Sequence, residues 1–246
     1  LQYENPERMY EWQKILSIKV KRHDKQSINY LTTDGIKLLL EQPDLSTGKG
    51  RRNLALLSLM YDSGARVQEM IDLTPSSVRL DDPSTVKLFG KGRKARIVPL
   101  QAEQTVFLKK YMQENHLLEP YANQYPLFSN TRKEKFTRAG ITYILKTYAK
   151  LARKINPLLI PKTISCHSLR HSKAMHLLQA GVNLVYIRDL LGHVSVQTTD
   201  VYARADSKQK RAAFENAYVD INPDIAKTKS WEKDDNLLAW LRNLAT

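Results

Sequence analysis

The chain is poor in the features that mark secreted, disulfide-built and membrane-spanning proteins. Only one of its 246 residues, Cys166, is a cysteine, so no disulfide can form within the chain. It contains no run of about 18 apolar residues, the length that a membrane-spanning helix needs. No charged-then-apolar leader precedes the first domain signals. We therefore expect a cytoplasmic protein with no membrane partner.

Sequence patterns for several kinds of catalysis are missing as well. A phosphate-binding loop of the form GxxxxGK[ST] does not occur, and no acidic cluster suits a two-metal nuclease. His167 and His171 have the spacing of two zinc ligands on one helix face. However, Ser168 stands where the zincin pattern has glutamate. We therefore expect no cofactor and no metal ion.

Acidic residues are too few to balance the basic ones. The chain has 25 Asp and Glu against 39 Lys and Arg, which gives a net charge of +14 and a pI near 9.7. Such an excess favours a polyanion as partner, and nucleic acid is the usual one. A lipid surface would require a concentrated basic cluster, whereas these residues are spread along the chain. A solvated basic surface without a ligand is the alternative.

Composition along the chain suggests three segments. Residues 1–30 are polar and basic and read as a linker or tail, and because the chain opens on Leu1 we expect it to begin inside a longer protein. Residues 31–219 carry the pattern of one folded domain. Residues 220–246 read as a tether followed by a helix from about 231 to 244. The apolar stripe of that helix could pack on its own domain or on a neighbouring protomer.

The middle segment predicts an α+β fold, mostly helical with one small antiparallel sheet. Thr32 or Thr33 can cap a helix that ends near Pro43, and the helix over 51–63 is apolar on nearly every side, which predicts a central position. Gly64 suits the end of that helix. The remaining predicted elements are strands over 85–89 and 96–100, joined by the turn 90–95, and helices over 101–115, 137–155, 166–180 and 183–191.

Four motifs hold the residues that could carry chemistry. They are SGARVQEM (63–70), GKGRKARIVPL (90–100), HSLRH (167–171) and LGHVSVQTTDVYAR (191–204). His167 and Arg170 are three residues apart and share one face of a helix. His193 precedes Tyr202 by nine residues.

In order, spacing and local context these motifs resemble the tyrosine recombinase, or phage integrase, family, with a catalytic domain of the XerC and XerD kind. The resemblance covers roughly residues 30–215. The first motif differs slightly, since many members read TGLRxSE where this chain reads SGARVQE. The resemblance assigns Tyr202 as nucleophile and Glu69 as a supporting acid. It assigns the other catalytic residues as Arg66, Lys91, His167, Arg170 and His193.

The same residues suit the cleavage of a phosphodiester bond. Tyrosine is a weak nucleophile because its pKa is about 10, so it needs a base and nearby cations. Arg66 and Arg170 can fork onto the phosphoryl oxygens, and His193 can donate a further hydrogen bond. Lys91, on a flexible turn, can protonate the leaving oxygen. We expect His167 to accept the tyrosine proton.

Each candidate also has a structural interpretation. Arg66 could be a buried arginine paired with Glu69, and Lys91 could be a solvated lysine, with Arg93 or Lys94 taking its role. His193 could simply end a helix, and Tyr202 could be a core aromatic. Cys166 is best interpreted as a buried, inert thiol.

The resemblance implies a site-specific DNA recombinase of the integrase or transposase type. Such an enzyme cleaves and rejoins DNA through a 3′-phosphotyrosine, needs neither ATP nor metal, and acts as a homo-oligomer, a tetramer on two DNA sites. A helical DNA-binding domain usually precedes the catalytic domain in this family, and here only the basic tail stands in that place. The alternatives are a type IB topoisomerase, which would relax supercoils as a monomer, and a DNA-binding regulator without catalysis.

Overall fold

A computed structural model describes residues 6–18, 29–90, 92, 94–192, 199 and 202. By its contacts the chain divides into two units, Leu1–Asp206 and Ser207–Thr246, and all described residues belong to the first. The expected tether and the helix over 231–244 therefore lie outside the described residues. Two of the expected catalytic residues, Lys91 and His193, also lie outside them.

The basic tail contains more regular structure than a linker. Pro6–Arg8 form a 3-10 turn, η1, and Met9–Leu16 form α1. No residue of α1 is buried, so the apolar side chains of this helix contribute nothing to a core of the described residues.

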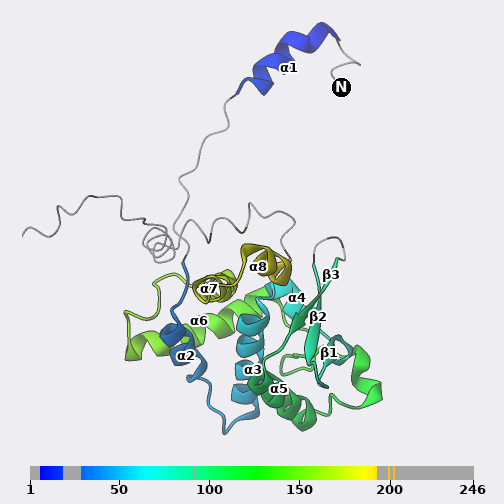
Figure 1. The fold of residues 1–246 in the computed structure, drawn as a ribbon, viewed down its shortest axis with the longest axis vertical. Coiled ribbons are helices and arrows are strands. Elements are labelled where there is room, and N and C mark those ends of the chain that lie inside the picture. The colour runs from blue at the N-terminus through cyan, green and yellow to red at the C-terminus, as the bar shows by residue number, and fades with distance from the viewer. Residues whose placement is uncertain are drawn as a thin grey trace, which may run out of the picture. The chain divides into compact units, whose positions relative to one another are not determined.

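Helices dominate the domain that follows (Figure 1). A mostly helical fold with one small antiparallel sheet was expected and is confirmed. In the described part of the chain, no helix is both long enough and apolar enough to cross a bilayer. The helices are α2 (Thr33–Leu40), α3 (Gly48–Ser63), α4 (Val67–Ile71), α5 (Ala102–Glu114), α6 (Arg138–Ile155), α7 (Cys166–Gln179) and α8 (Leu184–Leu191), with 3-10 turns η2 (Pro75–Ser77) and η4 (Pro120–Gln124).

Threonine caps set where several helices begin. The hydroxyl of Thr32 accepts a hydrogen bond from the Gly35 amide at 3.2 Å, which starts α2 as expected. Thr47 accepts from the Gly50 amide at 3.0 Å, so α3 begins three residues before the predicted Arg51. At its other end α3 stops at Gly64, whose φ of +58° is the left-handed conformation that favours glycine.

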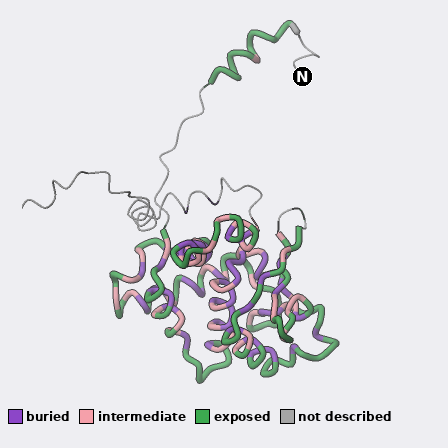
Figure 2. Tube along the Cα trace, in the orientation of Figure 1, coloured by how far each residue is buried: buried purple, intermediate pink, exposed green. Residues whose placement is uncertain are grey.

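Helix α3 lies at the centre of the domain and packs against α2, α4, α5 and α7. Its consecutive residues Ala55, Leu56 and Leu57 are all fully buried. Three successive residues point in three directions around a helix, so most of the circumference of α3 is covered along this stretch, and Figure 2 shows buried residues concentrated there. Truncating such a leucine to alanine typically costs about 2–5 kcal/mol.

A three-stranded antiparallel sheet lies beside the helices, in the order β1 (Val78–Arg79), β2 (Thr85–Phe89) and β3 (Ala95–Pro99). The predicted strand over 96–100 is displaced by one residue, and β1 was not predicted because it is only two residues long. In the pairing of β2 with β3, Val86 lies opposite Val98, and both are buried. Leu88 lies opposite Arg96, which places an arginine on the side of the sheet that faces the core.

A smaller apolar cluster joins α7 and α8 to Tyr202. Met175 and Leu178 of α7 pack with Ile187 and Leu191 of α8, and Tyr202 is buried among them with 3% of its surface exposed. The burial of the tyrosine ring fixes its position relative to both helices.

Candidate active site

The first expected catalytic arginine, Arg66, is held where two helices meet. The chain leaves α3 at Gly64 and enters α4, of which Arg66 is the N-cap. The carboxylate of Glu69, in the first turn of α4, accepts from the Arg66 amide at 2.7 Å and from its Nη1 at 2.9 Å. A carboxylate is favoured at a helix N-terminus, where the amide groups point outward. Glu69 therefore orients both the backbone and the guanidinium of Arg66.

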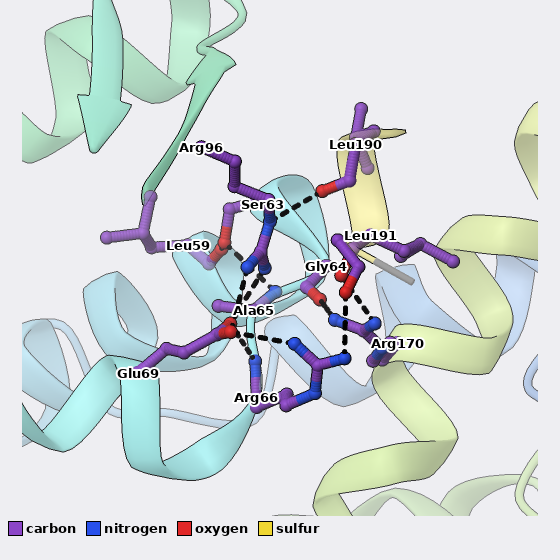
Figure 3. A network of polar contacts seen from close by, with 11 residues as sticks. Leu59, Ser63, Gly64, Ala65, Arg66, Glu69, Arg96, Arg170, Leu190 and Leu191 are labelled. Carbon is purple, nitrogen blue, oxygen red and sulfur yellow. Dashed lines mark hydrogen bonds and ion pairs between the residues drawn. The ribbon is translucent and has the colours of Figure 1, made fainter. Parts of the chain in front are cut away.

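Glu69 is shared with a second arginine that the sequence motifs did not single out. Arg96 of β3 donates from Nη1 to Oε1 at 2.8 Å and from Nη2 to Oε2 at 2.7 Å, a two-pronged contact with the same carboxylate (Figure 3). The Glu69 side chain is only 3% exposed. Burial alone would raise its pKa, but hydrogen bonds from Arg96 and Arg66 lower it overall. The carboxylate is therefore charged at neutral pH.

The second expected arginine, Arg170 of α7, is buried and is held by backbone carbonyls. Its Nη1 donates to the carbonyl of Gly64 at 2.7 Å and its Nη2 to the carbonyl of Leu191 at 2.6 Å. Both carbonyls lie at helix C-terminal ends, where the last carbonyls lack partners in the helix and carry partial negative charge. Burial, together with Arg66 and Arg96, lowers the Arg170 pKa to about 10, so the guanidinium stays charged at neutral pH.

Three arginines from three segments converge on the end of α8. In Figure 3 the side chains of Arg66 and Arg96 meet at Glu69, and that of Arg170 reaches the carbonyls of Gly64 and Leu191. Three consecutive carbonyls accept one hydrogen bond each. The pairs are Arg96 with Leu190 at 2.8 Å, Arg170 with Leu191 at 2.6 Å, and Arg66 with Gly192 at 3.1 Å. Three guanidiniums and one carboxylate leave an excess of positive charge that suits a phosphate.

The nucleophile candidate pairs with a histidine of α7. The hydroxyl of Tyr202 lies 2.8 Å from Nδ1 of His171, and the two ring centroids are 5.6 Å apart. His167, one turn earlier on α7, has its ring centroid 6.0 Å from that of His171. Burial raises the pKa of Tyr202, while the charges of Arg170 and Arg66 act in the opposite direction.

Both histidines are held in the neutral form. Burial is the largest cause that lowers the pKa of His167, followed by the charges of Arg170 and Arg66. For His171 burial is again the largest cause that lowers the pKa, followed by His167 and Arg170. Since an isolated histidine titrates near pH 6.5, each of these rings can accept a proton at pH 7.

The structure thus brings together five of the expected residues: Arg66, Glu69, His167, Arg170 and Tyr202. The two that lie outside the described residues have neighbours that approach the site. A Cβ on Gly90, just before Lys91, would lie 3.4 Å from Oε1 of Glu69.

On the other side, Gly192 precedes His193. A Cβ on Gly192 would lie 3.0 Å from Nη1 of Arg96, and its φ is +64°. A side chain at this position would therefore both strain the backbone and displace Arg96. The chain next to the two residues outside the described set is thus fitted closely to the arginine cluster.

Sequence reasoning missed Arg96 and the contact of His171 with Tyr202. Arg96 lies inside the GKGRKARIVPL motif, and an arginine on the core-facing side of a strand signals a buried acidic partner. His171 was considered only as a zinc ligand. Within the described residues, no three His, Cys, Asp or Glu side chains gather as metal ligands would. Cys166 is buried as expected, and burial raises its thiol pKa.

Comparison with known proteins identifies the family. A family model described as the phage integrase family matches residues 29–209. The integrase/recombinase y4rC of Sinorhizobium fredii is 34% identical over 242 residues, which cover 98% of this chain and 70% of that protein. Tyrosine recombinase XerD of Staphylococcus epidermidis is 36% identical over 199 residues, which cover 80% of this chain and 65% of XerD. The chain thus spans about two thirds of the length of these relatives.

Solved structures with the same fold are also recombinases. The XerA recombinase superposes with a TM-score of 0.64 at 25% identity, over 80% of this chain and 66% of XerA. The XerH site-specific recombinase, bound to a palindromic difH substrate, gives a TM-score of 0.65 at 27% identity, over 77% of this chain and 53% of XerH. The family match, the relatives and the shared fold agree with the motifs and with the arginine cluster. The chain belongs to the phage integrase family, a family of tyrosine recombinases.

Proposed function

We propose that this chain is the catalytic part of a site-specific DNA recombinase that cleaves one strand by attack of Tyr202 on a phosphodiester and holds the DNA as a 3′-phosphotyrosine. The observation that carries the proposal is the convergence of Arg66 and Arg170 on the last turn of α8, with the Tyr202 hydroxyl paired to a neutral histidine of α7. A phosphoryl group bound by two guanidiniums and a nucleophile beside a base are what such a reaction requires.

The two arginines are proposed to bind the non-bridging phosphoryl oxygens. A guanidinium has five N–H donors in a fixed plane. In Arg170, Nη1 and Nη2 each donate one hydrogen bond to a backbone carbonyl. We assign the remaining donors to a phosphate whose charge grows in the transition state. Loss of one such donor typically slows a reaction by about 10²–10³-fold.

Lys91 and His193 complete the proposed site. Lys91 is assigned to protonate the leaving 5′ oxygen, and the approach of Gly90 to Glu69 supports this place for the hairpin turn. His193 is assigned a hydrogen bond to a phosphoryl oxygen, supported by the anchoring of Gly192 to Arg66. His167 is exposed on the same face of α7 as Arg170, where DNA can reach it.

The covalent intermediate explains how such an enzyme would rejoin DNA without ATP. The phosphotyrosine bond conserves the energy of the broken phosphodiester, and a 5′ hydroxyl from a second strand can attack it. No metal ion or cofactor is required in this scheme, so cleavage is expected to persist in EDTA. A strict requirement for divalent metal would contradict it.

Double-stranded DNA is the proposed substrate, and a tetramer on two sites is the proposed assembly. The XerH structure is described as a post-cleavage complex with its difH substrate, and the net charge of +14 fits a DNA partner. We assign the apolar stripe of residues 231–246 to contacts between protomers. Deleting these residues should weaken assembly on paired sites more than binding to one site. Normal synapsis by the truncated protein would contradict this role.

The decisive experiment is to trap the covalent complex. A nicked duplex that releases a short fragment after cleavage prevents religation, so the adduct accumulates and survives denaturation. Sequencing the attached end identifies the target. Tyr202→Phe should bind DNA with nearly unchanged affinity and form no adduct, whereas Tyr143→Phe, at an exposed tyrosine of α6, should form it normally.

The outcomes separate the competing functions. An adduct formed by the Tyr202→Phe variant would overturn the assignment of the nucleophile. Efficient relaxation of supercoiled DNA of any sequence by a monomer would favour a type IB topoisomerase. Binding without any adduct from the unaltered chain would favour a non-catalytic regulator.

A further inference from the structure

We propose that His171, rather than His167, accepts the proton of Tyr202 when the tyrosine attacks DNA. The proposal rests on the proposed function and specifies one catalytic group within it. Its basis is the contact between Nδ1 of His171 and the Tyr202 hydroxyl at 2.8 Å, a distance at which a proton can pass directly between the two atoms.

The two histidines differ in burial, and this difference assigns them different roles. His171 is half-buried beneath the tyrosine ring, whereas His167 is exposed one turn nearer the start of α7. An exposed ring beside Arg170 is placed to meet the DNA. A half-buried ring against the nucleophile is placed to act on the nucleophile.

The charges around His171 keep it ready to accept a proton. Arg170 and His167 on its own helix act on the ring, and both lower its pKa after the larger effect of burial. Arg66, at the start of α4, acts on the hydroxyl of Tyr202 together with Arg170. The guanidiniums of Arg66 and Arg170 favour the phenolate, and that of Arg170 disfavours an imidazolium at His171. The proton therefore moves only as negative charge passes from the tyrosine oxygen to the phosphate.

The proposed step moves one proton at each end of the phosphoryl transfer. The tyrosine oxygen forms the new bond to phosphorus while its proton moves to Nδ1 of His171. The bond between phosphorus and the 5′ oxygen breaks, and the leaving oxygen keeps the electron pair and takes a proton from Lys91. On religation the imidazolium returns its proton to the departing tyrosine oxygen. The resting histidine must therefore carry its hydrogen on Nε2.

The test is single-turnover cleavage of the nicked trapping duplex by the full chain, measured as a function of pH. The wild-type rate should rise to a plateau as His171 loses its proton, with a midpoint below about pH 6.5. His171→Asn places an acceptor oxygen near the position of Nδ1 but cannot take up a proton. Its rate at pH 7 should fall by about 10²–10⁴-fold, with no plateau and with DNA affinity unchanged.

Two variants of α7 serve as controls. Nδ1 of His176 lies 2.8 Å from the hydroxyl of Tyr61, away from the site. The His176→Asn variant therefore removes a histidine–tyrosine contact like that of His171 with Tyr202, and this variant should cleave at the wild-type rate. His167→Asn should lower the rate but keep the acid limb of the pH profile, with the midpoint moved upward because His167 no longer lowers the pKa of His171. If instead this variant removes the acid limb, the proton acceptor is His167 and the proposal fails.

A modified substrate separates the two ends of the reaction. A 5′-bridging sulfur leaves without needing a proton, so it should restore cleavage to Lys91→Ala and not to His171→Asn. Rescue of His171→Asn, or a rate within about threefold of wild type, would overturn the proposal. A faster rate would also overturn it and show that His171 restrains the tyrosine.

Two other outcomes are possible, a variant that does not fold and an unaltered chain that forms no adduct. If His171→Asn fails to fold, as judged by circular dichroism, His171→Gln provides the same comparison. If the unaltered chain forms no adduct on any substrate, the proposed function itself fails. An adduct from the unaltered chain together with an unaffected His171→Asn variant removes only the assignment of His171.

Discussion

The two arginines assigned to the phosphate are held in different ways. Arg66 is one-third exposed and is oriented by the side-chain carboxylate of Glu69, which Arg96 holds from the other side. Arg170 is buried and is oriented by the backbone carbonyls of Gly64 and Leu191. One half of the site therefore depends on a replaceable side chain, and the other depends on where two helices end.

This difference predicts which substitutions disrupt each half of the site. A backbone carbonyl cannot be removed by substitution, so the Arg170 side is disrupted only by changing Arg170 itself or by moving a helix end. The Arg66 side can be altered at Arg66, at Glu69 or at Arg96. The charge balance also differs, because Glu69 forms an ion pair with Arg66, whereas the groups that hold Arg170 are carbonyls without net charge.

The strongest test of the comparison is Arg170→Lys. A lysine keeps the charge but donates from a single nitrogen, so it loses the planar fork that reaches two carbonyls from two nitrogens and leaves further donors for a phosphate. We expect cleavage to fall by about 10³-fold, and one carbonyl left unsatisfied to cost about 1–3 kcal/mol of stability. Trapping assays and urea unfolding measure the two effects.

Arg51→Lys is the matched control, since Arg51 forms a surface ion pair with Glu114. This variant should differ little from the wild type. Near-normal cleavage by Arg170→Lys would show that the forked geometry at Arg170 is unnecessary.

Glu69→Gln should have the next largest effect. The amide removes the only negative charge that the described residues place between Arg66 and Arg96, and it directs an NH₂ group toward one guanidinium. Breaking a buried ion pair in this way typically costs about 3–5 kcal/mol. We expect a lower midpoint in urea and a cleavage rate that falls at least about tenfold. Unchanged stability would mean that the two arginines do not depend on this carboxylate.

Arg96→Lys should have a smaller effect on the same side. Lysine can still reach Glu69 but loses the fork and the hydrogen bond to the Leu190 carbonyl. We expect a loss of about 1–2 kcal/mol and a cleavage defect smaller than that of Glu69→Gln. Since Arg96 has no contact assigned to DNA, binding affinity should stay constant. A large loss of DNA affinity would instead indicate a direct contact with the substrate.

The outline of the site could be predicted from the sequence because its chemistry lies in short motifs. The resemblance of these motifs to the tyrosine recombinase family assigned five residues that the fold brings together. Local signals also worked for the caps at Thr32 and Gly64, where a single residue type meets a specific backbone requirement.

The contacts between motifs could not be predicted in the same way. The pairing of Arg96 with Glu69 depends on how β3 packs against α4, and that of His171 with Tyr202 depends on how α7 meets a distant segment. Neither relation follows from local spacing. Helix α4, five residues long, is too short for a periodic pattern to reveal.

The smallest predicted effect concerns acid stability. Because the pKa of Glu69 is lowered in the folded protein, its contribution to stability is complete above the usual glutamate pKa of about 4.3 and is lost as the pH falls through the lowered value. The difference in unfolding free energy between wild type and Glu69→Gln should therefore be constant above about pH 5 and shrink below about pH 4. Urea unfolding at each pH measures it. A difference that grows on acidification would contradict the lowered pKa.

Because three consecutive carbonyls at the end of α8 each accept a hydrogen bond from one arginine, the length of this helix determines whether the site can form. Each residue added to a helix rotates everything beyond it by about 100°, so one insertion within Leu184–Leu191 would turn all three acceptors away from their arginines at once. The same insertion would displace the chain that leads to Tyr202. We therefore expect working variants of this enzyme to tolerate changes of side chain along the outer face of α8 and to reject any change in its residue count.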